Sequence, residues 1–234
     1  MKRIMTGRAA KLLLTVLLIL NIVFLLPQPR AEAAQGENAR WTALLKKYKK
    51  KKADRLIFVQ YKGGSRCRVR MYKKILKENG KTGWKRILSC AGYVGQNGIG
   101  KERQGDMKTP KGTYAVTAAF GILDDPGTQI PYIKLNRYLY WSGEAGTYNT
   151  MVDSRQLGHI PSGSEHLIAY DPYYNYALAI GYNKKCIAGK GAAIFLHCTG
   201  ERDYTHGCVA IPEKKMRRIM LNATKRTKIC IYPM

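Results

Sequence analysis

The chain has 234 residues, 45% of them hydrophobic, which allows one sizeable hydrophobic core together with an N-terminal extension. The formal net charge is +26, because 41 lysines and arginines outnumber 15 acidic residues. Such a charge indicates a polyanionic partner, and nucleic acid is the first class to consider. The N-terminal segment argues against that class.

The first 33 residues have the three regions of a secretory signal peptide. A basic start at Met1–Arg3 precedes an apolar run at 12–26, which Pro27 ends before the small residues Ala31 and Ala33. The run is shorter than the ~20 residues of a membrane-spanning helix. We therefore expect cleavage after residue 33 and a secreted protein of the cell envelope or cell wall, with an uncleaved anchor as the alternative. Export excludes nucleic acid as the partner.

Residues 34–54 form a basic segment that we expect to be a helix or a linker. Apolar residues at helical spacing lead into the lysine-rich run Lys46–Lys52. The run is either a solvated linker or an electrostatic tether to anionic cell-envelope polymers or the membrane surface.

From residue 55 onward the pattern is that of β-structure. Residues 56–61, a glycine turn and the alternating segment 67–72 predict a hairpin, and further strands are expected at 84–90 and 113–118. No regular alternation of strands with helices is present. Residues 55–234 therefore predict one mainly β domain with minor α, built as a β-sandwich or mixed sheet.

Two glycine-rich segments lie between these strands. Residues 95–101 carry the glycines and lysine of a phosphate-binding loop, but Glu102 stands where Ser or Thr should hold magnesium. No helical pattern follows, so we reject a nucleotide site. The second segment, Gly105–Tyr114, contains Pro110 and Gly112 and predicts a turn.

Residues 121–166 are rich in loops and aromatic side chains, which either face a sugar or peptide in a cleft or pack beneath the loops. Core strands are expected at 165–170 and 176–180. The apolar run 193–198 then predicts a buried strand that carries His197 near its end.

Cys208 gives the strongest chemical signal. A free thiol has a pKa of about 8.5 and is mostly protonated at neutral pH, so it needs a base to act as a nucleophile. His197 and His206 are the histidines near it in sequence, and either can serve by spacing alone. Gly207 permits a tight or positive-φ backbone, so that its amide and that of Cys208 could face a developing oxyanion. The alternative is a structural cysteine beside two structural histidines.

The remaining cysteines leave other interpretations open. His197, Cys198, His206 and Cys208 could ligate zinc, but the pairwise spacing of zinc motifs is absent, and we expect no metal or cofactor. Five cysteines remain beside Cys208, so they cannot all pair internally. They form a partial disulfide set or are small buried hydrophobic residues.

A helix is expected after Cys208. It would open at Pro212–Glu213 and bury Met216, Ile219 and Met220, before a last strand at 229–232. A helix start so near Cys208 would favour the thiolate through the helix dipole and lower the thiol pKa.

These segments resemble a known family. His197 with Thr205–Val209 resembles the signature of L,D-transpeptidase (YkuD-like) catalytic domains, in which a histidine precedes a Ser/Thr-His-Gly-Cys-hydrophobic motif. Gly105–Tyr114 is similar to the family's Gly-Asp-x-Lys-Thr-Pro-x-Gly-x-aromatic segment, so the resemblance covers the predicted β domain. There are two departures: the interval from His197 to Cys208 is short, and Ala210 stands where many members carry Arg or Asn.

The resemblance implies that Cys208 is the nucleophile, that His197 accepts and donates the proton, and that His206 supports the site. It also implies a substrate-binding wall formed by Thr109, Gly112, Tyr114 and Thr205.

The implied reaction is an exported cysteine acyl transfer that cross-links peptidoglycan stem peptides (3→3) through a thioester and releases D-alanine. Two alternatives are open: an L,D-carboxypeptidase, in which water resolves the thioester, and a non-catalytic basic module that binds the wall.

Overall fold

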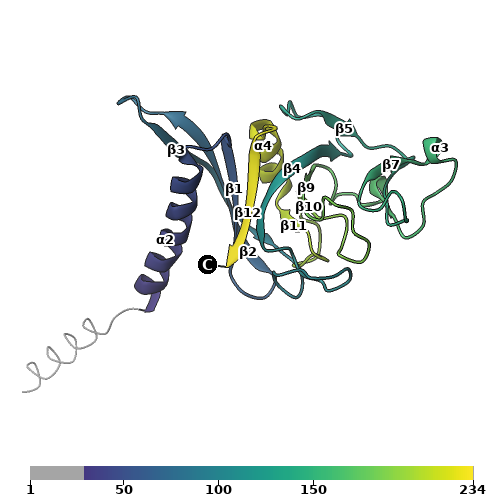
Figure 1. Cartoon of the computed structure of the whole chain (residues 1–234), viewed down its shortest axis with the longest axis horizontal. Coiled ribbons are helices and arrows are strands. Elements are labelled where there is room, and N and C mark those ends of the chain that lie inside the picture. Colours follow the sequence, from purple (N-terminus) through teal and green to yellow (C-terminus); the bar gives the residue numbers. More distant parts are fainter. Residues whose placement is uncertain (1–28, 234) are drawn as a thin grey trace, which may run out of the picture. The chain divides into compact units, whose positions relative to one another are not determined.

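The computed structural model describes residues 29–233 (Figure 1). Most of the predicted signal peptide, residues 1–28, lies outside this range. The described part of the chain divides into two units between Leu44 and Leu45. Among the described residues, no helix combines the length and the apolar composition needed to cross a membrane.

Helix α2 (Pro29–Lys49) takes up most of the segment that we expected to be a basic helix or linker. Three lysines of the run 46–52 occupy its last turn, where positive charge interacts favourably with the carbonyl end of a helix. All lysines of this run are exposed.

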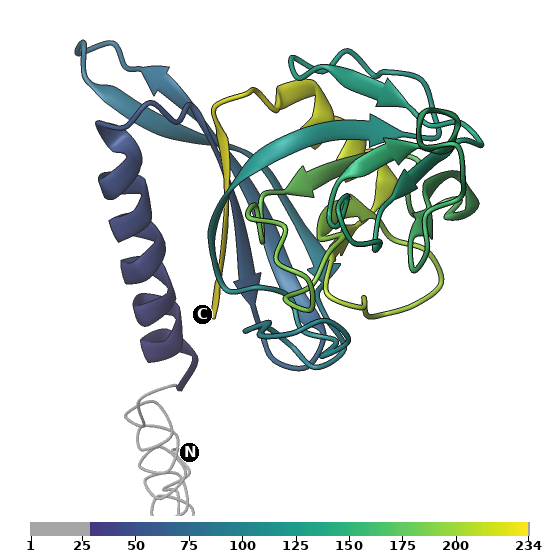
Figure 2. The same ribbon diagram turned by 45° about the vertical axis from the view of Figure 1, so that its right-hand side comes forward.

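The second unit is built on one mixed sheet of nine strands, in the order β12-β1-β2-β3-β11-β10-β9-β4-β5. These strands are β1 (Arg55–Tyr61), β2 (Arg66–Leu76), β3 (Thr82–Tyr93), β4 (Gly112–Gly121), β5 (Tyr132–Lys134), β9 (Ala177–Ile180), β10 (Phe195–Cys198), β11 (Val209–Ile211) and β12 (Thr227–Pro233). Strand β12 pairs with β1 and also with β4, the long curved strand of Figure 2, and this second pairing closes the sheet into a ring. The predicted mainly β fold with a mixed sheet is confirmed.

The predicted hairpin is present, because β1 pairs antiparallel with β2 along its whole length. Residues 56–59 of β1 have no exposed surface, since both faces of the strand are covered. Ile57 and Val59 enter the main core, to which nearly every strand of the ring contributes. Phe58 points the other way and packs on Tyr72, with ring centroids 5.2 Å apart.

Helix α4 (Glu213–Asn222) follows β11 and confirms the predicted helix after Cys208. Met216, Ile219 and Met220 lie on one face at helical spacing, and all three are fully buried in the main core. The helix therefore anchors the segment that carries Cys208 to the main core.

A second, smaller sheet has the order β7-β6-β8. Its elements are β6 (Leu139–Trp141), β7 (Met151–Asp153) with the short helix α3 (Ser154–Leu157), and β8 (Glu165–His166) with the 3₁₀ helix η1 (Leu167–Ala169). The strand predicted at 165–170 is therefore wrong beyond residue 166. The chain turns there and buries Leu167 completely in a second core, which also holds Phe120, Trp141 and Phe195.

Candidate active site

The site depends on the two short parallel strands β10 and β11. Leu196 lies opposite Val209, and both side chains enter the main core. Because successive side chains of a strand point to opposite faces, His197 on β10 faces away from that core. Cys208, directly before β11, faces the same way and joins the second core. The register thus brings the predicted nucleophile and base to one face of the sheet.

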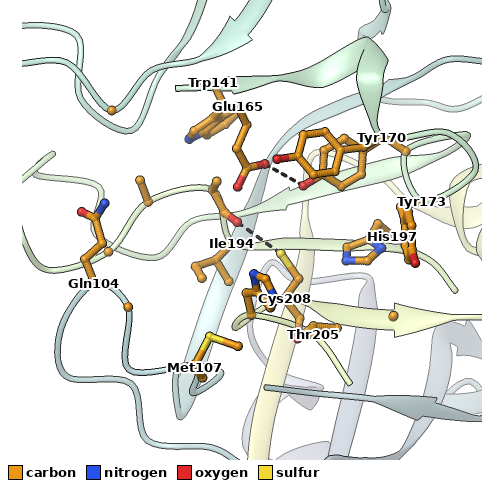
Figure 3. A pocket seen from close by; sticks show the side chains of 18 of the residues that line it. Gln104, Met107, Trp141, Glu165, Tyr170, Tyr173, Ile194, His197, Thr205 and Cys208 are labelled. Carbon is orange, nitrogen blue, oxygen red and sulfur yellow. Dashed lines mark hydrogen bonds between the residues drawn. The ribbon is translucent and has the colours of Figure 1, made fainter. Parts of the chain in front are cut away.

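A cavity of about 450 Å³ opens on this face (Figure 3). Its walls come from the loop at 101–107, from the small sheet and the segment that follows it (141–143 and 163–174), and from residues 191–210. Cys208 and His197 both line the cavity, and so does part of the aromatic loop region that we expected to face a ligand or to pack.

The Cys208 thiol is buried and hydrogen-bonded to backbone. Its Sγ donates to the carbonyl oxygen of Ala193 at 3.2 Å (Figure 3) and accepts from the amide of Phe195 at 3.3 Å. Burial raises the thiol pKa to about 12, with the charge of Glu165 as a second cause. The thiol is therefore protonated at neutral pH.

The prediction that a helix dipole lowers this pKa is wrong. Strand β11 lies between Cys208 and α4, whose first residue is Glu213. The dipole acts over about one turn at a helix end, so it does not reach the thiol.

His197 is buried, and its tautomer is fixed by the backbone. Nδ1 lies 2.8 Å from the carbonyl oxygen of Cys198. A carbonyl only accepts, so Nδ1 carries the hydrogen and Nε2 keeps a free electron pair. Burial lowers the pKa of His197 to about 4, against a smaller raising effect of the bond to Cys198. The imidazole is therefore neutral at neutral pH and ready to accept a proton.

Two buried threonine hydroxyls hold the carbonyl oxygen of Cys208. Thr205 Oγ1 donates to it at 2.7 Å and Thr109 Oγ1 at 3.0 Å. Each hydroxyl also accepts one amide: Gly207 N–H donates to Thr205 at 3.1 Å, and Gly95 N–H to Thr109 at 2.8 Å. These four bonds fix the backbone at the nucleophile.

This network corrects two expectations. Thr109 has no exposed surface, so it positions Cys208 and cannot contact a substrate as predicted. The Gly207 amide is directed at Thr205 and is not free for an oxyanion. Gly207 is required for another reason: its φ is +141°, and a Cβ there would lie 3.0 Å from the carbonyl oxygen of Lys108.

The Gly-Asp-Met-Lys-Thr-Pro segment builds one cavity wall around Asp106. This carboxylate accepts from Lys101 Nζ at 2.6 Å and from the amides of Glu102, Lys108 and Arg103 at 2.7, 3.0 and 3.1 Å. Burial alone would raise the pKa of Asp106, but these hydrogen bonds outweigh it and hold the pKa well below its usual range. The carboxylate therefore stays charged and fastens the loop.

The remaining predicted site residues have different positions. Thr205 and His206 line the cavity. His206 is exposed at its rim, where Nε2 accepts from Arg202 Nη1 at 3.3 Å. Gly112 and Tyr114 lie where β4 pairs with β12, outside the cavity lining, and Tyr114 Oη donates to the carbonyl oxygen of Lys111. The structure thus does not bring these last two residues to the site.

Cys198 and Cys208 point to opposite faces of the sheet. Cys198 lies in the main core, where Sγ donates to the carbonyl oxygen of Tyr176 at 3.6 Å. The four residues weighed as a zinc site therefore do not converge. In residues 29–233, no three His, Cys, Asp or Glu side chains are grouped as a metal site requires.

The cavity residues that sequence reasoning missed include Glu165, Tyr170 and Tyr174. The only signal for Glu165 was its charge at the start of a segment that we interpreted as a core strand. Tyr174 donates to Glu165 Oε2 at 2.7 Å and packs edge-on against His197, with ring centroids 5.4 Å apart.

A model of the YkuD family, the L,D-transpeptidase catalytic domain, matches residues 68–231. The chain belongs to this family. This membership confirms the resemblance that the two sequence motifs indicated, and it assigns the described sheet and cavity to an L,D-transpeptidase catalytic domain.

Among solved structures, "Structure of the Ldtfm-avibactam carbamoyl enzyme" is similar at 14% identity, with a TM-score of 0.32. The match covers 77% of this chain and 48% of that one, so the chain spans about half the length of that relative. The comparison with curated proteins gives no match.

Thr109→Val should lower both stability and the reactivity of Cys208. The change leaves the Gly95 amide without its acceptor and removes one donor from the Cys208 carbonyl, which should cost about 1–3 kcal/mol of unfolding free energy. Urea denaturation measures this cost. Thr82→Val, at a partly exposed position of β3 where the hydroxyl has no hydrogen-bond partner in the described part of the chain, is the matched control and should stay within about 0.5 kcal/mol of wild type. Equal stability of the two variants would contradict the positioning role.

The alkylation of Cys208 should depend steeply on pH. The thiolate is the reactive form, so a pKa of about 12 predicts slow reaction with iodoacetamide at neutral pH and a rate that still rises through the alkaline range. Cys186 is the one cysteine that is not buried, so the measurement is made on Cys186→Ser protein. Urea-unfolded protein is the control, and its alkylation rate should level off near pH 8.5 to 9. The same plateau in the folded protein would show that burial does not set the pKa.

Proposed function

We propose that the protein is an exported cysteine acyltransferase that makes 3→3 cross-links between peptidoglycan stem peptides. One observation carries this proposal: a buried thiol and a neutral imidazole lie on the same face of the sheet and line one cavity. Membership of the L,D-transpeptidase family supplies the reaction class.

In the proposed first step, the donor peptide enters the cavity and Cys208 turns from the Ala193 carbonyl toward His197. Nε2 of His197 takes the thiol proton, and the thiolate attacks the carbonyl at the L-centre of the third stem residue. The C–N bond to the terminal D-alanine breaks, and the departing amine takes the proton from His197. A Cys208 thioester remains.

In the second step, an amine of a neighbouring stem attacks the thioester and restores the thiol. The amide of Cys208 is our candidate oxyanion donor, because in the described part of the chain it has no hydrogen-bond acceptor, whereas the Gly207 amide is occupied. Covalent attachment divides one difficult exchange into two easier steps. We propose no cofactor.

We also propose that the exposed lysines of the run 46–52 hold the enzyme near anionic polymers of the envelope or the membrane surface. Their attraction is long-ranged only at low ionic strength, since the screening length is about 8 Å at 0.15 M salt. Such contacts would raise the local concentration of the enzyme at its substrate without contributing to the reaction.

Cys208→Ala should abolish the release of D-alanine from a defined tetrapeptide muropeptide. The variant removes the proposed nucleophile and little volume, so the fold should persist. Mass analysis of the products, with and without an added acceptor peptide, separates the alternatives. Cross-linked dimer identifies a transpeptidase, and tripeptide alone identifies a carboxypeptidase. Retained muropeptide binding without any product in the wild type would identify a wall-binding module.

His197→Gln should slow thioester formation by about two to four orders of magnitude, the contribution of a positioned general base. His206→Ala should slow thioester formation much less, because His206 is exposed at the rim of the cavity and contacts Arg202. Single-turnover release of D-alanine measures both effects. A greater loss in the His206 variant would reverse the assignment of the base.

A further inference from the structure

Glu165 is the one acidic side chain among the described residues that line the cavity. Its strand, β8, pairs with β6 so that Glu165 lies opposite Trp141, which fixes the backbone. Tyr174 Oη donates to Oε2 at 2.7 Å and fixes the carboxylate (Figure 3). The second oxygen, Oε1, has no hydrogen-bond donor within the described chain. The carboxylate is thus held rigidly in the cavity wall with one oxygen still able to accept.

No cation neutralises this carboxylate within residues 29–233. Two basic side chains line the cavity, and both are engaged elsewhere: Lys101 pairs with Asp106 at 2.6 Å, and Arg202 donates to His206 at 3.3 Å. A desolvated carboxylate without a cationic partner is costly unless a ligand supplies the charge. Although the chain as a whole has a net charge of +26, the Glu165 carboxylate makes this part of the cavity wall negative, and it therefore attracts a cationic group of a ligand.

Glu165 is close to both reacting side chains. Its negative charge contributes, after burial, to the raised pKa of the Cys208 thiol. Tyr174, which holds Glu165, also packs on the imidazole of His197. Burial raises the pKa of Glu165 itself, against a lowering effect of the Tyr174 bond, which makes it a better proton acceptor than an exposed carboxylate.

Building on the proposed function, we propose that Glu165 binds the primary ammonium group of the acceptor and takes one of its protons. A primary ammonium has a pKa of about 10.4 and cannot attack a carbonyl until it has lost a proton. The carboxylate provides first the counter-charge that holds the acceptor above the thioester and then the base that frees its electron pair.

The proton balance shows why a second base is useful. The ammonium gives one proton to Glu165, and the resulting amine attacks the thioester carbonyl. As the C–N bond forms and the C–S bond breaks, a second proton passes through His197 to the Cys208 sulfur. Glu165 then releases its proton to solvent. The products are an amide, the free thiol and one proton in solution.

Hydrolysis of the thioester needs only the proton transfer through His197. The attacking water is already neutral, and the transfer of one of its protons to the Cys208 sulfur restores the thiol. Glu165 therefore favours aminolysis over hydrolysis and sets which product the thioester yields. Removing its charge should shift the protein from transpeptidase toward carboxypeptidase.

The test compares wild type with Glu165→Gln, which keeps an acceptor for Tyr174 and removes the charge. The thioester forms from a tetrapeptide muropeptide, and the acceptor is Nα-acetyl-lysine amide. Because the charge of Glu165 also contributes to the raised pKa of the Cys208 thiol, the rate of thioester formation should change as well. The readout is therefore the ratio of amide to acid formed from the thioester, which we expect to fall by at least about tenfold. The deficit should shrink as the pH approaches the pKa of the acceptor, since free amine then needs no base. Hydroxylamine, which is uncharged at neutral pH, should react equally with both proteins.

Two controls complete the test. Glu144→Gln removes one charge from the loop after β6, outside the cavity lining, and should leave the ratio of amide to acid unchanged. Glu165→Asp should recover part of the amide formation. An unchanged product ratio in Glu165→Gln, or an equal loss with hydroxylamine, overturns the role of Glu165. A wild type that forms no thioester overturns instead the proposed function on which this role rests.

Discussion

The parallel pairing of β10 with β11 is the constraint on which the site depends. With Leu196 opposite Val209, alternation along each strand sends the apolar side chains to the main core and leaves Cys208 and His197 together on the other face. A slip of one residue on either strand would place the thiol and the imidazole on opposite faces. The hydroxyls of Thr109 and Thr205 hold the Cys208 carbonyl and so resist such a slip.

Burial decides the resting charge of the site. Both the thiol and the imidazole lose most of their hydration, and each is therefore neutral near pH 7. An ion pair between them is absent until substrate arrives, so the site does not carry a standing thiolate exposed to oxidants. The bonds from Sγ to Ala193 and Phe195 satisfy the thiol meanwhile.

Much of the fold was predictable because local pattern and burial agree. The hairpin of β1 and β2 follows from the alternation of residue types along the strands, and the apolar face of α4 follows from helical spacing. In both cases the apolar side chains of the pattern are buried in the core. The motif singled out Cys208 as the candidate nucleophile, and the structure places this residue in the cavity lining. The pKa of the Cys208 thiol was not predictable from the sequence. Strand β11 separates Cys208 from the helix, but it is only three residues long and its apolar residues run directly into the start of the helix, so the sequence does not reveal it as a strand.

Other site features depend on contacts between distant segments. Thr109 lies 99 positions from Cys208, and no local signal distinguishes a hydroxyl that will be buried behind the nucleophile from one that faces substrate. Glu165 sits among apolar residues that predicted a continuous strand, and only the turn into η1 shows that its segment serves the second core. Tyr114 carries the family motif, yet the closure of the ring draws it to β12.

The closure of the ring also determines when the site can form. Asp54 accepts hydrogen bonds from Thr224 and from Arg226, 170 and 172 positions away, and β1 beside it pairs with β12. Contacts so distant in sequence carry a high loop-closure entropy, and chains dominated by them fold slowly. During folding, β1 and β4 must therefore wait for residues 227–233. Until β12 is in place, both strands keep an unpaired edge, and the ring that carries the thiol and the imidazole cannot close.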